Sequence, residues 1–407
     1  MEKNSLIKFV IVVLVLVLTI TSYPFKKSEQ SNEVVFWTLQ MNDFAPYMNN
    51  VIKNFETLNP EIKIKWIDVP FSEGEKRTLA SVLSDTPPDL INLNPDFSAL
   101  LAQRGALYEI PEEYTEQYSK PIINSLKYNG KLYSLPWYAT SAITIYNKEL
   151  LKKAGVEFPK TYSDIEKIAP IIREKTGAYV LLPNITENDT MLRILNKYGV
   201  NSPEKINSEK SKEVFELFKI LYAKDLIPKE SVTQTHREAL EKYMAEQIVF
   251  FQAGANFLNM IKENAPQTYK NTDVAPQFVG DLGQNDFSLM NFVIPLKAKH
   301  KDEALKFALY LTNFENQLEL AKLTNVLAVN EKTLKDEFYS DNLTLMAKAR
   351  SISAKQLNKI EPTMKSTRNQ KELNTLVNTA VQQILLNKAP TQKILDDTAI
   401  KYKELLN

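Results

Sequence analysis

Aromatic rings and polar side chains recur near the predicted ends of strands in this chain of 407 residues. A ring compound that carries hydroxyl groups offers an apolar face to aromatic side chains and its hydroxyls to amides and carboxylates. The candidates for such contacts are Trp37, Gln40, Asn42, Asp43, Asn94, Asp96, Phe97, Trp137, Tyr138, Thr140, Asn184, Asn256, Phe257 and Asn291. These residue types predict a binding site for a polyhydroxylated solute such as a sugar.

Several of these candidates have an equally simple structural interpretation. Trp137 and Tyr138 follow a proline, which fixes φ and lacks a backbone donor, so we expect them at a strand end, where they could form a flat platform. The same rings would also suit a hydrophobic core, and so would Trp37. Asp43 and Asp96 could serve as helix N-caps without touching a ligand.

The residues of common catalytic and cofactor sites are absent or scattered. The chain has no cysteine, and its glycines form neither a GxGxxG turn nor a GxxxxGKS/T phosphate loop. His236 and His300 stand among polar and charged neighbours, and we expect both to be solvated surface residues. No carboxylate pair stands out for glycoside hydrolysis, which in retaining enzymes needs two carboxylates about 5 Å apart. We therefore predict that the protein is not an enzyme and holds no cofactor or metal.

The first 27 residues predict export. Residues 9–20 are almost unbroken Val, Ile and Leu after Lys3 and Lys8, which is typical of a signal peptide or a membrane anchor. The run is short for a spanning helix of ~20 residues, but it could just cross a membrane if it continued to residue 25. Whether this segment is cleaved off as a signal peptide or kept as an anchor therefore stays open. In both cases the rest of the chain is expected in the periplasm or on the outer face of the cytoplasmic membrane. Without cysteine it cannot be a Cys-lipidated lipoprotein.

Charge and size limit the partners and the architecture. Lys and Arg together number 50 against 49 Asp and Glu, so the formal net charge of +1 gives no basic surface for nucleic acid. A chain of this length exceeds one comfortable core, which predicts two lobes, and we expect a monomer.

The predicted elements must bring the candidate residues together. A strand at 34–39, a helix at 44–58 and an alternating strand at 62–69 indicate a parallel βαβ unit in an α/β fold. Loops after the carboxyl ends of such strands bind ligands. The run at 130–148 predicts a turn and two strands joined at an aromatic corner, where the chain crosses between lobes. Later elements are expected at 161–176 (helix), 178–182 (strand), 247–257 (strand into helix), 272–278 and 288–295 (strands), and 342–351, 370–387 and 391–406 (tail helices).

Six short motifs in order resemble those of family 1 extracellular solute-binding proteins, the carbohydrate-binding subunits of ABC importers. They are FETLNPEIKI at 55–64, PDLI at 88–91, LAQRGAL at 101–107, GKLYSLP at 130–136, IYNKELLKKAG at 145–155 and PKTYSD at 159–164. The resemblance spans about residues 34 to 333 and implies the two-lobed periplasmic-binding-protein fold of type II, with a hinge of crossing strands and a helical C-terminal tail. We expect lobe 1 at 34–139 plus 280–329, and lobe 2 at 140–279 plus 330–407.

The resemblance also implies where a ligand would lie. Asp96 matches a sugar-binding aspartate of a maltose-binding member of the family. Thr140 stands where that member has a glutamate, and Asn256 where it has a tryptophan. These two departures indicate a solute other than a maltodextrin.

The resulting hypothesis is an exported solute-binding subunit that holds a carbohydrate between its lobes and delivers it to the membrane permease of an ABC importer. An exported sugar sensor or adhesion protein without a transporter is an alternative, and a glycoside-active enzyme is a weaker one. The solute itself stays open. A phosphorylated ligand is one of the solutes that stay open, because Arg77, Arg104 or Arg193 could reach its phosphate group.

Overall fold

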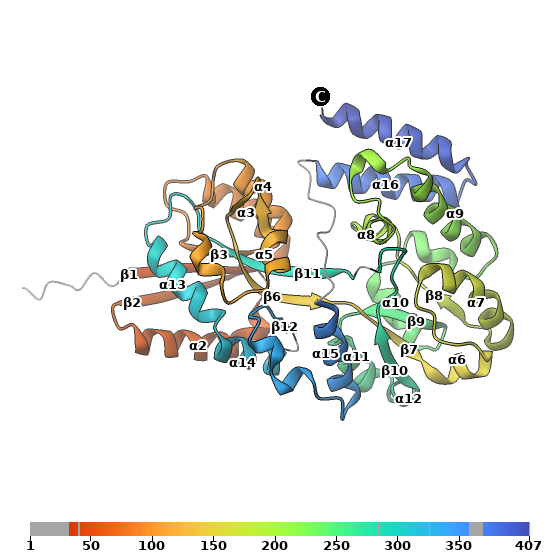
Figure 1. The fold of residues 1–407 in the computed structure, drawn as a ribbon, viewed down its shortest axis with the longest axis horizontal. Coiled ribbons are helices and arrows are strands. Elements are labelled where there is room, and N and C mark those ends of the chain that lie inside the picture. Colours follow the sequence, from red (N-terminus) through yellow and green to blue (C-terminus); the bar gives the residue numbers. More distant parts are fainter. Residues whose placement is uncertain (1–31, 40, 284, 325, 358–368, 407) are drawn as a thin grey trace, which may run out of the picture.

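A computed structural model describes residues 32–39, 41–283, 285–324, 326–357 and 369–406, and it shows two lobes joined side by side (Figure 1). Each lobe has its own β-sheet covered by helices, so the predicted two-lobed α/β fold is confirmed. The predicted signal peptide or anchor at 1–27 lies outside the described residues. Within the described part, no helix has the length and apolar character needed to cross a membrane.

Lobe 1 is built on a six-stranded sheet in the order β12-β6-β11-β3-β1-β2. Its strands are β1 (Asn32–Leu39), β2 (Ile62–Val69), β3 (Leu90–Leu93), β6 (Leu135–Ser141), β11 (Phe287–Val293) and β12 (Leu327–Ala328). β1 pairs in parallel with β2 and with β3, whereas β11 runs antiparallel between β3 and β6. The expected βαβ unit is therefore present, with α2 (Ala45–Leu58) as its helix.

Alternating side chains of the lobe 1 strands form two cores. Phe36 lies on the face covered by α2, α13 (Lys301–Leu311) and α14 (Phe314–Thr324), and it belongs to the larger core cluster. Ile91 and Leu93 belong to a second cluster, which α3 (Phe71–Val82) and α4 (Pro95–Gln103) cover. The sheet is thus sandwiched between two helical layers.

Lobe 2 has a four-stranded sheet in the order β10-β7-β9-β8, with β7 (Ile143–Asn147), β8 (Tyr179–Leu181), β9 (Ile248–Ala253) and β10 (Thr272–Pro276). Its helices are α6 (Lys148–Ala154), α7 (Tyr162–Thr176), α8 (Thr190–Lys197), α9 (Glu209–Ala223), α10 (His236–Met244), α11 (Phe257–Asn264), α12 (Pro266–Lys270), α16 (Gln370–Leu385) and α17 (Thr391–Leu406). Thr161 caps α7 in a reciprocal capping box with Asp164. The tail helices α16 and α17 pack on α9, along the upper edge of the lobe in Figure 1, and Gln370 at the start of α16 lines a cavity between the lobes.

Three segments connect the lobes. β6 of lobe 1 continues through Ala142 into β7 of lobe 2, and residues 277–286 lead back from β10 to β11. The third connection contains α15 (Leu345–Gln356), which packs against β10, β7 and β6. These crossings form the predicted hinge.

Two expectations differ from the structure. Residues 330–339 were predicted in lobe 2, but Leu334, Phe338 and Tyr339 pack on the lobe 1 core, and the Tyr339 hydroxyl accepts a hydrogen bond from the Ala328 amide at 2.9 Å. The aromatic corner expected at residues 136–138 is the interior of β6, which lies between β11 and β12. The turn before it is present, formed by Asn129 and Gly130 in left-handed conformations between β4 (Lys127–Tyr128) and β5 (Lys131–Leu132), after α5 (Lys120–Leu126).

Candidate functional site

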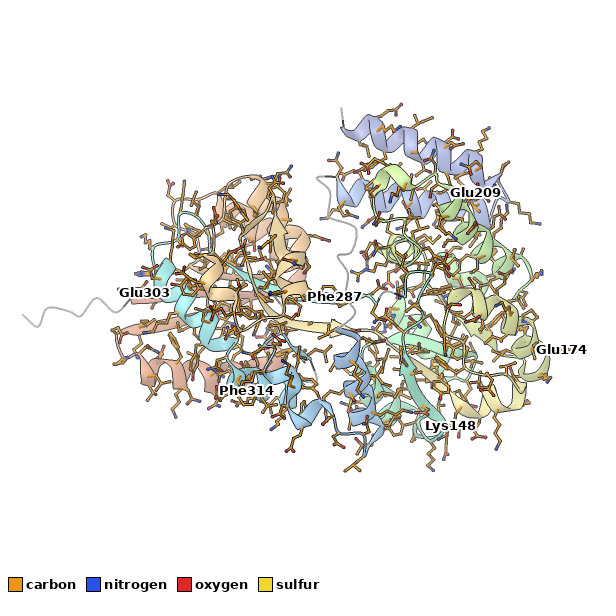
Figure 2. All side chains as sticks on the ribbon, in the orientation of Figure 1. Lys148, Glu174, Glu209, Phe287, Glu303 and Phe314 are labelled. Atoms are coloured by element: carbon orange, nitrogen blue, oxygen red, sulfur yellow. The ribbon has the colours of Figure 1, made fainter. Side chains whose placement is uncertain are left out.

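Two cavities meet between the lobes, and together they form the interlobe cleft. The first, of about 200 Å³, is lined by the N-terminus of α4, by α8 and by β11. The second, of about 340 Å³, lies at the carboxyl ends of β8 and β9, beside the crossing at residues 140–142. Arg193, Phe287 and Ser288 line both cavities, and Figure 2 labels Phe287 between the two lobes. The two cavities therefore adjoin, and the cleft has walls from both lobes.

The lobe 1 wall of the first cavity is the start of α4. Asn94 caps this helix, because its Oδ1 accepts a hydrogen bond of 2.8 Å from the Phe97 amide. Asp96, in the first turn, is exposed and lines the cavity. A capped helix start with an exposed carboxylate presents both amide and acid groups to a solute with hydroxyls.

The facing wall is α8 of lobe 2, which carries a fixed cation. Arg193 donates from Nε to Asp189 Oδ2 at 2.9 Å, and its side chain is 36% exposed. Burial disfavours its charge, but Asp189, Asp286 and Asp96 together raise the pKa of Arg193 above its usual value. Asn196, one turn further on, lines the first cavity with its Oδ1 buried and without a hydrogen-bond partner among the described residues.

The second cavity ends at a polar cluster of lobe 2. Asn184 adopts a positive φ of 37° and donates from Nδ2 to Glu187 Oε2 at 2.6 Å. The same carboxylate oxygen accepts a hydrogen bond of 2.9 Å from the backbone amide of His236. The His236 ring lies 4.8 Å from the ring of Phe251, at an interplanar angle of 30°. His236 is thus a half-buried residue of the cleft, and the expected solvated surface position is wrong.

Burial lowers the pKa of His236, although Glu187 opposes the shift. The folded protein therefore favours the neutral ring, and its contribution to stability is complete above the unfolded pKa of about 6.5 and is lost as pH falls towards the folded pKa. We expect the free energy of unfolding to fall more steeply between pH 7 and pH 5 in the wild type than in His236→Gln. Urea denaturation of both proteins at several pH values measures this, and parallel curves would contradict it.

Four predicted site residues come together in the cleft. Asn94 and Asp96 line the first cavity, and Thr140 and Asn184 line the second. They come from both lobes and from the crossing strand, as a ligand held between lobes requires.

Trp137 is not a platform in the cleft. Its side chain is fully buried in the lobe 1 core, and its ring stacks on Phe292 at 4.7 Å between centroids. Tyr138 is partly buried against the same core and stacks on Phe44 at 6.2 Å. The core interpretation of this pair is therefore the right one, because β6 is an inner strand whose side chains meet the covering helices.

The other candidates do not line either cavity. Phe97 and Asn291 are buried in lobe 1, where Asn291 Nδ2 donates to Ser98 Oγ at 2.7 Å. Trp37 is partly buried against the second lobe 1 core, with the Arg77 guanidinium 5.1 Å from its ring centroid. The remaining described ones are Asn42 and Asn256, which are exposed, and Phe257, which packs in lobe 2. Gln40 and the side chain of Asp43 lie outside the described residues.

Sequence reasoning missed most of the lobe 2 wall. The unpredicted cleft residues include Asp189, Asn196, His236, Gln252, Asp286 and Ser288. Arg193 was considered only as a possible phosphate ligand. One signal was available, since the run TMLRILNK has buried Met191, Leu192, Ile194 and Leu195 at helical spacing and so indicates a helix whose other face carries Arg193.

Comparison with known proteins agrees with this architecture. The model of the family described as bacterial extracellular solute-binding protein matches residues 50–347. The chain belongs to this family. Among its relatives, a multiple sugar-binding protein of Streptococcus mutans is 27% identical over 70% of this chain and 73% of its own length. A binding protein of Brucella abortus is 24% identical over 89% of this chain and 90% of its own length.

Solved structures extend the match to the whole described fold. A periplasmic-binding protein of Synechococcus sp. MITs9220 has a TM-score of 0.83 and 27% identity, covering 91% of this chain and 98% of that one. The sugar-binding protein MalE of Xanthomonas citri has a TM-score of 0.76 with 20% identity, over 92% and 97%. This family member therefore shares the fold of two-lobed binding proteins, and its cleft occupies the space between its lobes.

Proposed function

We propose that this protein is the exported solute-binding subunit of an ABC importer and that it holds an uncharged saccharide in the interlobe cleft. The observation that carries the proposal is the cleft itself, in which polar side chains from both lobes and from a crossing strand line two adjoining cavities. The family supports it, as do relatives named for multiple sugars in Streptococcus mutans and for arabinooligosaccharides in Bacillus subtilis.

The polar groups of the cleft suit hydroxyl groups. Asp96, Asp189 and Asp286 offer carboxylate oxygens as acceptors, and Asn184 and Gln252 offer amides. Apolar surface comes from aromatic side chains of the second cavity, which are Tyr162, Phe250, Phe251 and Phe287. A sugar needs both kinds of surface.

The arrangement supports binding by closure rather than conversion. A solute that contacts α4 of lobe 1 and α8 of lobe 2 stabilises the state in which the lobes approach, because only that state offers both sets of contacts. In this proposal the closed form is what the membrane permease recognises outside the cytoplasmic membrane. The solute leaves unaltered, and the protein acts as a monomer.

The charges of the cleft favour a neutral ligand over a phosphorylated one. Arg193 is already paired with Asp189, and Asp286 and Asp96 also stabilise its charge, so an added anion would meet negative charge in the same cleft. We expect titration calorimetry at neutral pH to show binding of at least one neutral mono- or oligosaccharide, and binding of its phosphate ester to be at least about tenfold weaker.

Titrations of a wider panel, with assays of sugar release and of permease stimulation, separate the alternatives. A panel of neutral saccharides, sugar phosphates and polyamines in which only the phosphates bind would overturn the assignment of a neutral ligand. Absence of binding to every member would count against the proposal as a whole, and release of a reducing sugar from a bound oligosaccharide would show an enzyme instead. Binding without stimulation of any permease would favour a sensor.

A further inference from the structure

The three connections between the lobes are joined by one buried polar network. Gln277 Nε2 donates to the Asp286 carbonyl at 3.0 Å and to the Ala142 carbonyl at 3.3 Å. Gln356 Nε2 donates to the same Ala142 carbonyl at 2.8 Å and to Ser141 Oγ at 2.9 Å. Gln356 Oε1 in turn accepts a hydrogen bond of 2.8 Å from the backbone amide of Gln277. Each crossing therefore contributes to one set of hydrogen bonds, and movement at one disturbs the others.

Lys197, the last residue of α8, completes this network from lobe 2. Its side chain is 2% exposed, and its Nζ donates to Gln277 Oε1 and to the Phe278 carbonyl, each at 2.7 Å. Its third partner is Asp286 Oδ2 at 3.0 Å. The ammonium group thus has two hydrogen bonds and one ion pair, and Asp286 opposes the lowering of the Lys197 pKa by burial. Removal of Asp286 would leave the Lys197 charge buried without an opposite charge.

The backbone around Lys197 also fits tightly against the second crossing. The Leu282 amide donates to the Lys197 carbonyl at 3.3 Å. A Cβ atom at Gly280 would lie 2.4 Å from the same carbonyl oxygen, so only glycine allows this approach. The crossing is therefore held to α8 through side-chain and main-chain contacts of Gln277, Phe278, Leu282 and Asp286.

The same two elements face the cleft. α8 carries Arg193 and Asn196 into the first cavity, and Asp286, whose side chain is 20% exposed, lines the second. Asp286 thus meets the hinge lysine with one oxygen while its carboxylate borders the space for the solute. Among the described residues, Asp286 is the only one that lines a cavity and also forms a salt bridge with Lys197.

We propose that Lys197 and Asp286 are positioning residues that couple the cleft to the hinge. By tying residues 277–286 to α8, the pair makes this crossing move with lobe 2 and confines bending to the points where Ser141 and Phe287 leave the lobe 1 sheet. A solute hydroxyl that donates a hydrogen bond to Asp286 then changes the contacts that hold the hinge. The part that concerns a solute rests on the proposed function, whereas the confinement of the hinge does not.

The test uses the full chain with Lys197→Met. Because the chain has no cysteine, single cysteines at the exposed positions Lys53 of lobe 1 and Lys152 of lobe 2 can carry spin labels. In the unliganded protein, pulsed electron spin resonance should show a broader distribution of interlobe distances for Lys197→Met than for the wild type. The dissociation constant of a saccharide that binds the wild type should rise about tenfold, because fewer molecules hold the lobes in a binding-competent orientation.

Matched variants separate coupling from a general loss of stability. Arg173→Met breaks an ion pair within lobe 2, in which an Arg173 guanidinium nitrogen lies 2.8 Å from Asp225 Oδ2. Neither residue lines a cavity. This variant should leave both the distances and the dissociation constant as in the wild type. Lys197→Arg keeps the charge and should restore part of the narrow distribution. If Lys197→Met does not fold, the double variant Lys197→Met with Asp286→Leu removes both charges, and its distance distribution should be as broad.

The outcomes are distinct. A folded Lys197→Met, or the double variant in its place, with the wild-type distance distribution would overturn the hinge assignment. An unchanged dissociation constant beside a broadened distribution would overturn the coupling to the solute. If the wild type binds no saccharide, the proposed function fails, and the distance measurement still decides whether the pair confines the hinge.

Discussion

Trp137→Ala is expected to lower the free energy of unfolding by about 3–5 kcal/mol, the range for deleting a large aromatic side chain from a core. Trp137 is fully buried, stacks on Phe292, and packs edge-on against Phe36 at 6.3 Å between ring centroids. Its backbone carbonyl accepts a hydrogen bond of 2.7 Å from Gln317 Nε2, which ties the strand to α14. Loss of the ring leaves a cavity at the centre of lobe 1 that the surrounding rings cannot fill without moving.

Equilibrium denaturation in urea measures this loss, and Trp66→Ala is the matched control. Trp66 is only partly buried on β2, where its Nε1 donates to Thr38 Oγ1 at 2.8 Å, so its removal should cost distinctly less. Saccharide affinity of the folded fraction should be close to the wild-type value for both variants. A stable Trp137→Ala protein that had lost its affinity would instead place Trp137 in the site.

Local patterns in the sequence were sufficient for the elements that carry their own signal. The alternating strand predicted at 62–69 is β2 with the same bounds, and the helix predicted at 161–176 is α7, which begins one residue later after its Thr161 cap. Asn94 and Asp96 were expected at the sheet edge after a parallel strand, and both line the first cavity there, Asn94 as the cap and Asp96 in the first turn of α4. Where the local rule and the fold agree, the prediction holds.

The aromatic pair failed because tertiary pairing overrode a local rule. Proline is normally excluded from inner strands, and Pro136 therefore suggested a strand end. In the structure it faces Asn291, next to an irregularity in the pairing of β6 with β11 between Met290 and Asn291. The bulge at this point removes the need for a backbone hydrogen bond that proline cannot donate. β6 therefore continues as an inner strand, and Trp137 lies in the core.

Lys197 and the lobe 2 wall could not be read from local pattern. A lysine is expected at the surface, and the groups that make its burial possible, Gln277 and Asp286, are 80 and more residues away in the chain. Arg193 is recognised as a cleft residue only when α8 is placed opposite α4. Long-range proximity of this kind exists only in the folded protein.

Arg193→Met is expected to weaken saccharide binding by about tenfold to 100-fold, which corresponds to the loss of one hydrogen bond to a charged group. Arg193 lines both cavities and is held by Asp189, so its guanidinium is already oriented before the solute arrives. Methionine keeps much of the side-chain volume but removes the donors, and it leaves Asp189 and Asp286 with less positive charge nearby. Titration calorimetry with the tightest saccharide found for the wild type gives the ratio of dissociation constants.

Arg237→Met is the matched control, because Arg237 also pairs through Nε with an acidic residue four positions away, Glu241, at 3.6 Å. That pair is 86% and 59% exposed on α10 and lines neither cavity, so its removal should change affinity and stability little. A specific loss in Arg193→Met would show that the oriented cation, and not helix pairing in general, binds the solute. Equal affinities of the two variants would instead move the solute away from the junction of the cavities, towards the end of the cleft at Asn184, and Asn184→Ala would then have to show the larger loss.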